Sequence, residues 1–168
     1  MKKFLFLATM MLVACLGMNA QEAKYQGEID LSYSIGTGTF STNRVNLHTI
    51  HGAKMNDYFS IGVGLGLDYY HELYREEGDG ELVIPIFLNT KAYLPVDEKL
   101  SPYVSLDLGY GIGATKGVSG LGGFLWSPAI GLKYDKVKFQ VGYVNQNVSE
   151  SGISISLNAV QFMIGVIF

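Results

Sequence analysis

Residues 61–70, IGVGLGLDYY, alternate an apolar residue with a glycine or an aspartate almost to the end of the stretch. A period of two places successive side chains on opposite faces of a β-strand, so one face here is aliphatic and the other nearly bare. A strand surface that meets water usually carries Lys, Glu or Thr, and glycine weakens a strand unless close packing requires it. The stretch therefore predicts a strand with a tightly packed glycine face and an apolar face turned the other way.

The same alternation recurs along the chain, for example in residues 105–113, SLDLGYGIG. It predicts eight strands and no helix after the N-terminal segment. The expected strands cover residues 25–36, 43–54, 58–70, 82–94, 102–113, 123–134, 137–147 and 156–168. Short connections near 55–57, 97–99 and 134–136 alternate with longer ones at 37–42, 71–81, 114–122 and 148–155.

An even number of strands, with long connections at one end and short ones at the other, is typical of an all-β, antiparallel up-and-down barrel. The interior of an eight-stranded barrel is just wide enough for side chains to fill. The glycine faces are therefore expected to point inward, where large residues such as Phe87 can lie over them. The sequence thus predicts an eight-stranded transmembrane β-barrel with a lipid-facing apolar exterior and a filled, polar and glycine-rich interior.

The N-terminal residues 1–20, MKKFLFLATMMLVACLGMNA, have the basic start, short apolar middle and small-residue end of a cleaved signal peptide. The barrel domain is then residues 21–168. An alternative is a lipobox ending at Cys15, which would make Cys15 the lipidated first residue of a lipoprotein. Cleavage after Ala20 removes Lys2, Lys3 and the one cysteine, so the formal net charge of −3 becomes −5 and no disulfide can form. This charge argues against nucleic acid as a partner.

The composition supports a chain that exposes apolar surface. Hydrophobic residues make up 48% and charged residues only 16% of the sequence, against about 25% charged in a typical soluble domain. Aromatic residues gather near both ends of the expected strands, as they do at the two interfaces of a membrane. The interface aromatics are taken as Tyr33, Tyr110 and Trp126 at the long-loop end and Tyr134 at the short-turn end. The same groups also contain Tyr70, Tyr93 and Tyr103.

With its export signal, its strands 61–70 and 105–113 and its ending QFMIGVIF, the chain resembles the small outer-membrane β-barrel proteins of Gram-negative bacteria, the porin-like outer-membrane β-barrel domain family. The resemblance spans the whole mature chain. It implies a place in the outer membrane with both termini periplasmic, and outer-membrane lipids as surroundings. It also implies that the barrel-assembly machinery recognises the last strand through Phe162, Ile164, Val166 and the terminal Phe168. The family is united by fold, so the resemblance implies no particular activity and leaves the oligomeric state open.

The expected interior carries charges of both signs. The acids are Glu28, Asp30, Asp68 and Asp107, and the bases are Arg44, Lys54, Lys91, Lys133 and Lys138. A lone buried charge costs several kcal/mol, so mixed signs predict ion pairs. The hairpin of the fourth and fifth strands favours a pair of Lys91 with Asp107. Such pairs are expected to plug the barrel, because an aqueous channel typically needs about 16 strands.

Candidate catalytic and metal-binding residues are few. His48 and His51 are three residues apart on one strand, hence on opposite faces, and cannot share a metal ion. The acidic connection 71–81 lacks the spacing of a calcium-binding EF-hand and is taken as a solvated loop. A hydrolase could combine His48 or His51 with Ser60 and either Asp68 or Asp107, but no specific signature supports it. The sequence therefore predicts no catalytic residue, no metal site and no cofactor.

The function expected from these features is that of a non-enzymatic integral outer-membrane barrel, structural or binding through its extracellular loops, without a large open pore. One alternative is a secreted, lipocalin-like soluble barrel that carries an apolar ligand. Another is a lipid-modifying outer-membrane enzyme.

Overall fold

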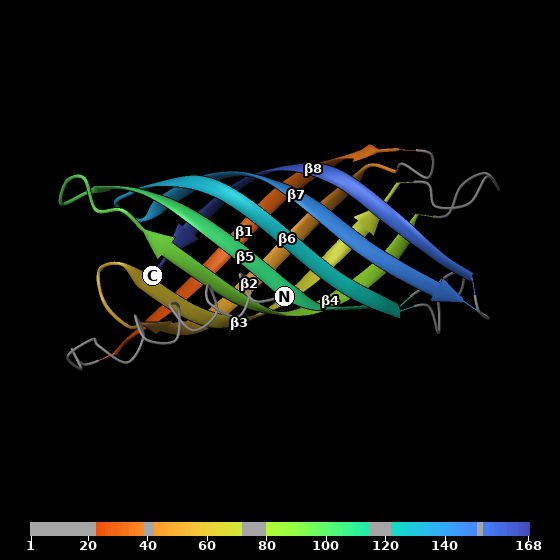
Figure 1. The fold of residues 1–168 in the computed structure, drawn as a ribbon, viewed down its shortest axis with the longest axis horizontal. Coiled ribbons are helices and arrows are strands. Elements are labelled where there is room, and N and C mark those ends of the chain that lie inside the picture. The colour runs from red at the N-terminus through yellow and green to blue at the C-terminus, as the bar shows by residue number, and fades with distance from the viewer. Residues whose placement is uncertain (1–22, 39–41, 72–79, 115–121, 151–152) are drawn as a thin grey trace, which may run out of the picture.

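The computed structural model describes residues 23–38, 42–71, 80–114, 122–150 and 153–168. Its strands are β1 (Lys24–Thr37), β2 (Arg44–Lys54), β3 (Phe59–Tyr70), β4 (Glu81–Tyr93), β5 (Leu100–Gly113), β6 (Gly122–Tyr134), β7 (Val137–Glu150) and β8 (Ile153–Ile167). They join in chain order into one closed barrel, and β8 pairs with β1 (Figure 1). The predicted eight-stranded antiparallel barrel is confirmed, with every strand boundary within three residues of its expected place. Within the described ranges, no helix has the length and apolar character needed to cross a bilayer. The proposed signal peptide with Cys15, and residues 39–41, 72–79 and 115–121 of the longer connections, lie outside these ranges.

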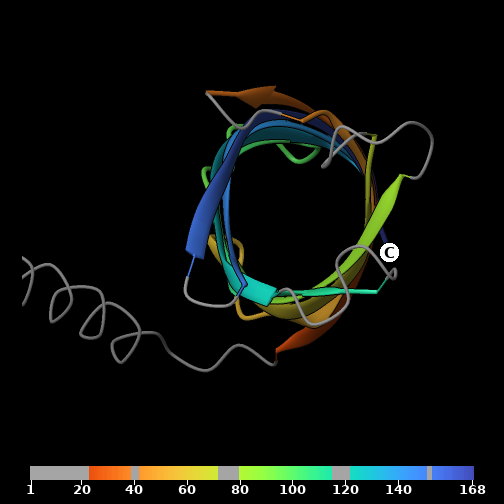
Figure 2. The ribbon, with the colours of Figure 1, turned by 90° about the vertical axis from the view of Figure 1, so that its right-hand side faces the viewer.

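The strands are tilted, as the pairing register shows. Moving from Glu28 on β1 to the directly opposite residue on each next strand leads to Leu157 on β8. Since Asn158 pairs with Thr37, Leu157 is level with Gly38, ten residues beyond Glu28. Closing a sheet with such a stagger requires strands inclined to the barrel axis. Side chains from strands that are not neighbours in the sheet therefore meet in the lumen, inside the closed ring seen end-on in Figure 2.

The barrel closes along its last strand. The register of β8 with β1 runs from Glu28–Ile167 to Thr37–Asn158, which includes the predicted contact region around residues 29–33. Beyond it, the backbones of Gly27 and Phe168 exchange two hydrogen bonds, each 2.8 Å long. The seam consequently leaves no unpaired strand edge over this length, as a barrel in lipid requires.

Polar and apolar side chains separate by face. On β1, Ile29, Leu31, Tyr33 and Ile35 point outward and are 43–53% exposed. The residues between them, Glu28, Asp30, Ser32 and Ser34, point inward and are at most 4% exposed. The same holds on β8, where Phe162, Ile164, Val166 and Phe168 are exposed and Gln161 and Met163 are buried. The inside-out orientation predicted from the glycine faces is thus the observed one.

Not all of the predicted aromatic belts lie on the outside. Tyr33, Tyr110, Trp126 and Tyr134 are exposed on the outer wall. Tyr70, Tyr93 and Tyr103, by contrast, are buried in the lumen. Their positions alternate with the outward residues of their own strands. This alternation, and not closeness to a strand end, determines which face a side chain occupies.

The three short turns lie where they were expected, but the β7–β8 connection differs. Tyr134 and Val137 pair directly, so residues 135 and 136 alone form the β6–β7 turn. Asp135 there has φ +53°, a left-handed conformation that aspartate tolerates better than most residues. The predicted long loop 148–155 is wrong, because Glu150 pairs with Ile153 and both strands continue into it. Ser149 and Ser154, which pair with each other, have strand backbones because ladder pairing satisfies their peptide groups as well as water would.

Candidate functional site in the polar lumen

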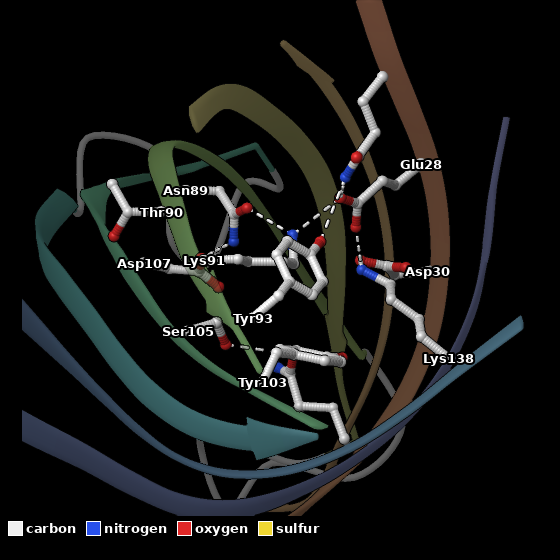
Figure 3. Close-up of polar contacts among 12 residues, drawn as sticks. Glu28, Asp30, Asn89, Thr90, Lys91, Tyr93, Tyr103, Ser105, Asp107 and Lys138 are labelled. Carbon is white, nitrogen blue, oxygen red and sulfur yellow. Dashed lines mark hydrogen bonds and ion pairs between the residues drawn. The ribbon is translucent and has the colours of Figure 1, made fainter. Parts of the chain in front are cut away.

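The most charged part of the lumen lies nearer the short turns. Lys91 on β4 reaches Glu28 on β1, with 2.9 Å between Nζ and Oε1. Lys138 on β7 donates to Oε2 of the same glutamate and to Oδ2 of Asp30 at 2.8 Å. All four side chains are at most 2% exposed, and Figure 3 shows them converging from three strands. We call Glu28, Asp30, Lys91 and Lys138 the lumen cluster.

A glycine on the intervening strand allows Lys138 to reach β1. Gly165 of β8 lies opposite both Lys138 and Asp30. A Cβ at Gly165 would overlap Oδ1 of Asp30 and lie 2.7 Å from Cε of Lys138. Because Gly165 has no side chain, the side chains of Lys138 and Asp30 can meet directly over its backbone.

The predicted direct pair of Lys91 with Asp107 is not observed. In the register of β4 with β5, Asp107 faces Asn89, while Lys91 faces Ser105. Asn89 joins the two charges instead, because its Nδ2 donates to Asp107 and its Oδ1 accepts from Lys91 (Figure 3). Asp107 is thus two residues away from the position opposite Lys91, and Lys91 turns across the lumen to Glu28.

Asp68 pairs with a histidine. His48 Nε2 and Asp68 Oδ1 are 2.7 Å apart on β2 and β3, and the His48 ring lies over Gly66 and 5.1 Å from the ring of Phe87. Sequence reasoning considered His48 as a metal ligand or base and missed it as an ion-pair partner. The alternation of β2 places His48 on the inward face, where the acids of β1 and β3 also lie. This shared face was the sequence signal that could have predicted the ion pair.

The proposed hydrolase residues do not come together as a set: His48 contacts Asp68, but Ser60 lies far from both. His48 lies opposite Gly66, and Ser60 is six residues away on β3, about 20 Å along the strand. His51 is on the outer wall, where its ring nitrogens contact the Tyr25 hydroxyl at 2.6 Å and the Thr49 hydroxyl at 2.9 Å. Among the described residues, no group of three or more His, Cys, Asp or Glu side chains is arranged to hold a metal ion.

The remaining predicted bases lie apart from the lumen cluster. Lys54 and Lys133 line a recess at the short-turn mouth of the barrel. Lys54 donates to Asp57 in the β2–β3 turn at 2.9 Å, and this hydrogen bond lowers the pKa of the exposed Asp57 carboxyl. Within the described ranges, Lys133 takes part in none of the ion pairs.

Arg44 begins β2 at the long-loop end of the lumen and is 1% exposed. Its Nη1 donates to the Tyr70 hydroxyl and, at 3.3 Å, to Oε1 of Gln146. The Tyr70 hydroxyl donates to the same Gln146 oxygen at 2.6 Å, and the guanidinium stands 5.1 Å from the centre of the Tyr70 ring. The sequence marked Arg44 as an inward base, but its partners come from β3 and β7, which only the closed register brings together.

The glycine faces work as packing surfaces, as expected. A Cβ at Gly64 would overlap the ring of Phe87, and one at Gly109 would meet the Phe87 backbone. Phe87 is 2% exposed and belongs to a small apolar layer with Ile50, Leu125 and Val144. This layer separates the lumen cluster from the Arg44 end of the lumen.

We expect Gly64→Ala to destabilise the barrel by about 1–3 kcal/mol, because the added methyl displaces the Phe87 ring from a closely packed lumen. Unfolding by guanidinium in lipid vesicles measures the loss. In a Phe87→Leu background the same substitution should cost clearly less, since the overlapping ring is gone. Equal costs in the two backgrounds would contradict this packing role.

Comparisons with known proteins agree with the geometry. No protein-family model matches the chain, and no curated protein matches it in sequence. Among solved structures, Neisserial surface protein A is similar with a TM-score of 0.61 and 13% identity over 88% of this chain and 98% of that one. The outer-membrane enzyme PagL has a TM-score of 0.57 and 13% identity, with coverage of 82% and 98%. The N-terminal β-barrel domain of Pseudomonas aeruginosa OprF has a TM-score of 0.51 and 15% identity, with coverage of 88% and 100%. The chain therefore has the fold of the small, eight-stranded outer-membrane β-barrel proteins.

Proposed function

We propose that this protein is an integral outer-membrane barrel with a closed lumen, which acts as a structural or binding element of the membrane and not as a pore. The observation that carries the proposal is that the barrel is apolar on the outside and polar on the inside, the reverse of a soluble protein. Apolar side chains cover the outer wall on all eight strands, while carboxylates, lysines and an arginine fill the inside. This arrangement suits a hydrocarbon solvent outside the barrel.

The outer wall also has a surface groove that suits lipid. A groove of about 860 Å³ crosses β4 to β8 between two rows of apolar side chains, and Gly131 lies in its floor. The groove is flanked by Leu94, Leu132 and Phe139 on one side and by Val104, Ile130 and Phe162 on the other. Acyl chains of the surrounding bilayer are the natural occupants of such a surface.

The filled lumen supports the absence of a large pore. The lumen cluster links β1, β4 and β7 across the barrel, and above it the Phe87 layer joins β2, β4, β6 and β7. An ion that crossed would have to break buried ion pairs, which is costly in a low-dielectric interior.

The two alternatives receive less support. A lipocalin-like carrier holds an apolar ligand inside the barrel, whereas this lumen is polar and charged. The fold by itself neither supports nor argues against an enzyme, because the similar structures include PagL, an outer-membrane enzyme. The catalytic combinations considered from the sequence are, however, split between the two faces or about 20 Å apart.

The outer-membrane location with periplasmic termini rests on the signal-like segment 1–20 and on the exposed strand face Phe162, Ile164, Val166 and Phe168. We include in the proposal that this face is read by the barrel-assembly machinery, and that partners are met at the long-loop end.

Cell fractionation with gel migration and conductance measurements tests the proposal. The protein should need detergent for extraction, and its unboiled band should shift on boiling, because the closed ladder of eight strands resists detergent. Reconstituted into planar bilayers, it should show no large, stable conductance. A detergent-free periplasmic protein with an unshifted band would contradict the membrane location, and a large steady conductance would contradict the closed lumen.

A further inference from the structure

The guanidinium of Arg44 has one edge bound and one edge free. Its Nη1 is held by Tyr70 and Gln146, and the Tyr70 ring lies beside it. Its Nε and Nη2, both buried, make no hydrogen bond. Nε and Nη2 are the two donors of a single edge, the one that binds a carboxylate or phosphate through two parallel hydrogen bonds.

Arg44 also forms no ion pair among the described residues, although Asp68 lies close enough to attract it. No carboxylate in these ranges lies within ion-pair distance of it. Asp68, two residues from Tyr70 on β3, is the nearest acid in the register, and it is bound to His48. A buried and unpaired charge costs several kcal/mol, so an arginine this deep is expected to have an anionic partner.

Neighbouring groups on the same wall add unused donors. Asn46 accepts a hydrogen bond from Ser34 through Oδ1 and lies directly opposite Asp68 on β3, while its Nδ2 forms no close hydrogen bond. Ser32, directly opposite Asn46 on β1, has a buried hydroxyl without a partner. An N–H edge, an amide N–H and a hydroxyl that can donate therefore share one region of β1 and β2, and each could bind an acceptor.

We propose that the long-loop end of the lumen binds a small oxyanion, a carboxylate or phosphate group, on the Nε–Nη2 edge of Arg44. Tyr70 and Gln146 orient the guanidinium from its other edge, and Asn46 and Ser32 provide additional donors nearby. Arg44 is the first residue of β2, next to Asn43, whose carbonyl accepts the His71 N–H at the rim of the barrel. The anion therefore enters from the long-loop end, the end opposite the lumen cluster. This inference does not depend on the membrane location.

The test uses the arginine side-chain signals of ¹⁵N-labelled protein in detergent micelles. Arg44 and Arg75 are the two arginines of the sequence, so two Nε–H resonances are expected, and Arg44→Lys assigns them by removing one. Titration with sodium acetate or sodium phosphate should shift the Arg44 resonance saturably, relative to sodium chloride at the same ionic strength. A shift with acetate alone identifies a carboxylate ligand, one with phosphate alone a phosphate ligand, and one with both a general oxyanion site.

A second readout checks the geometry of binding. The active anion should slow the heat-induced conversion of the folded band on a gel. Arg44→Lys keeps the charge but loses the two-donor edge, so it should need at least about tenfold more anion for the same effect. Lys54→Gln, at the opposite mouth, should respond as the wild type does. An Arg44 resonance that responds to neither anion beyond the chloride control, or an undiminished response in Arg44→Lys, would overturn the proposal.

Discussion

Replacing Lys138 by methionine should destabilise the barrel by about 3–5 kcal/mol, because it leaves two buried carboxylates without their shared cation. Lys138 is fully buried and contacts both Glu28 and Asp30. Lys91 then remains as the one cation of the cluster, held by Glu28, and Asp30 keeps no ion pair among the described residues. Equilibrium unfolding in guanidinium with the protein refolded into phospholipid vesicles measures the loss.

Two controls separate charge from packing in this experiment. The double variant Asp30→Asn, Lys138→Met removes one positive and one negative charge and leaves the Glu28–Lys91 pair in place, so most of the stability should return with the loss of the unpaired carboxylate. Lys54→Met breaks a solvent-exposed pair with Asp57 and should cost at most about 1 kcal/mol. If Lys138→Met cost no more than Lys54→Met, the lumen cluster would not hold the barrel together.

The strands and their inward faces could be predicted from the sequence because both depend on local pattern. A period of two assigns Glu28, Asp30 and Lys138 to one side of the wall without knowledge of their neighbours. The predicted large-over-small packing was correct for Phe87, which lies over Gly64. The errors at Tyr70 and Tyr103 arose where closeness to a strand end was given more weight than strand parity, which had placed Tyr93 on the inward face of its strand.

The pairing of the charges could not be predicted in this way, since it depends on register and closure. Shifting β4 by two residues against β5 exchanges Asn89 for Lys91 as the partner of Asp107. Lys138 meets Asp30 across Gly165 only after β8 has closed on β1. The Arg44 partners Tyr70 and Gln146 are 26 and 102 residues away in the chain. No local pattern encodes contacts between such distant strands.

Replacing Leu65 by arginine should destabilise the barrel in lipid vesicles by about 2–4 kcal/mol, the cost of an arginine on a lipid-facing wall near the bilayer midplane. Leu65 lies midway along β3, points outward and is 49% exposed. Guanidinium unfolding in phospholipid vesicles measures the change. The matched control is Val96→Arg, a more exposed apolar site in the β4–β5 turn, where a charge near the interface should cost about 0–1 kcal/mol.

This pair of variants discriminates between a membrane wall and a water-facing one. On a soluble barrel, a half-exposed leucine on the outer face could become arginine within about 0.5 kcal/mol, as most surface substitutions do. In a bilayer the same change places a guanidinium in hydrocarbon, and the depth of the site sets the cost. A loss at Leu65 but not at Val96 is therefore the result expected of a transmembrane barrel. Equal and small effects at both sites would mean that water, and not lipid, is the solvent of this apolar wall.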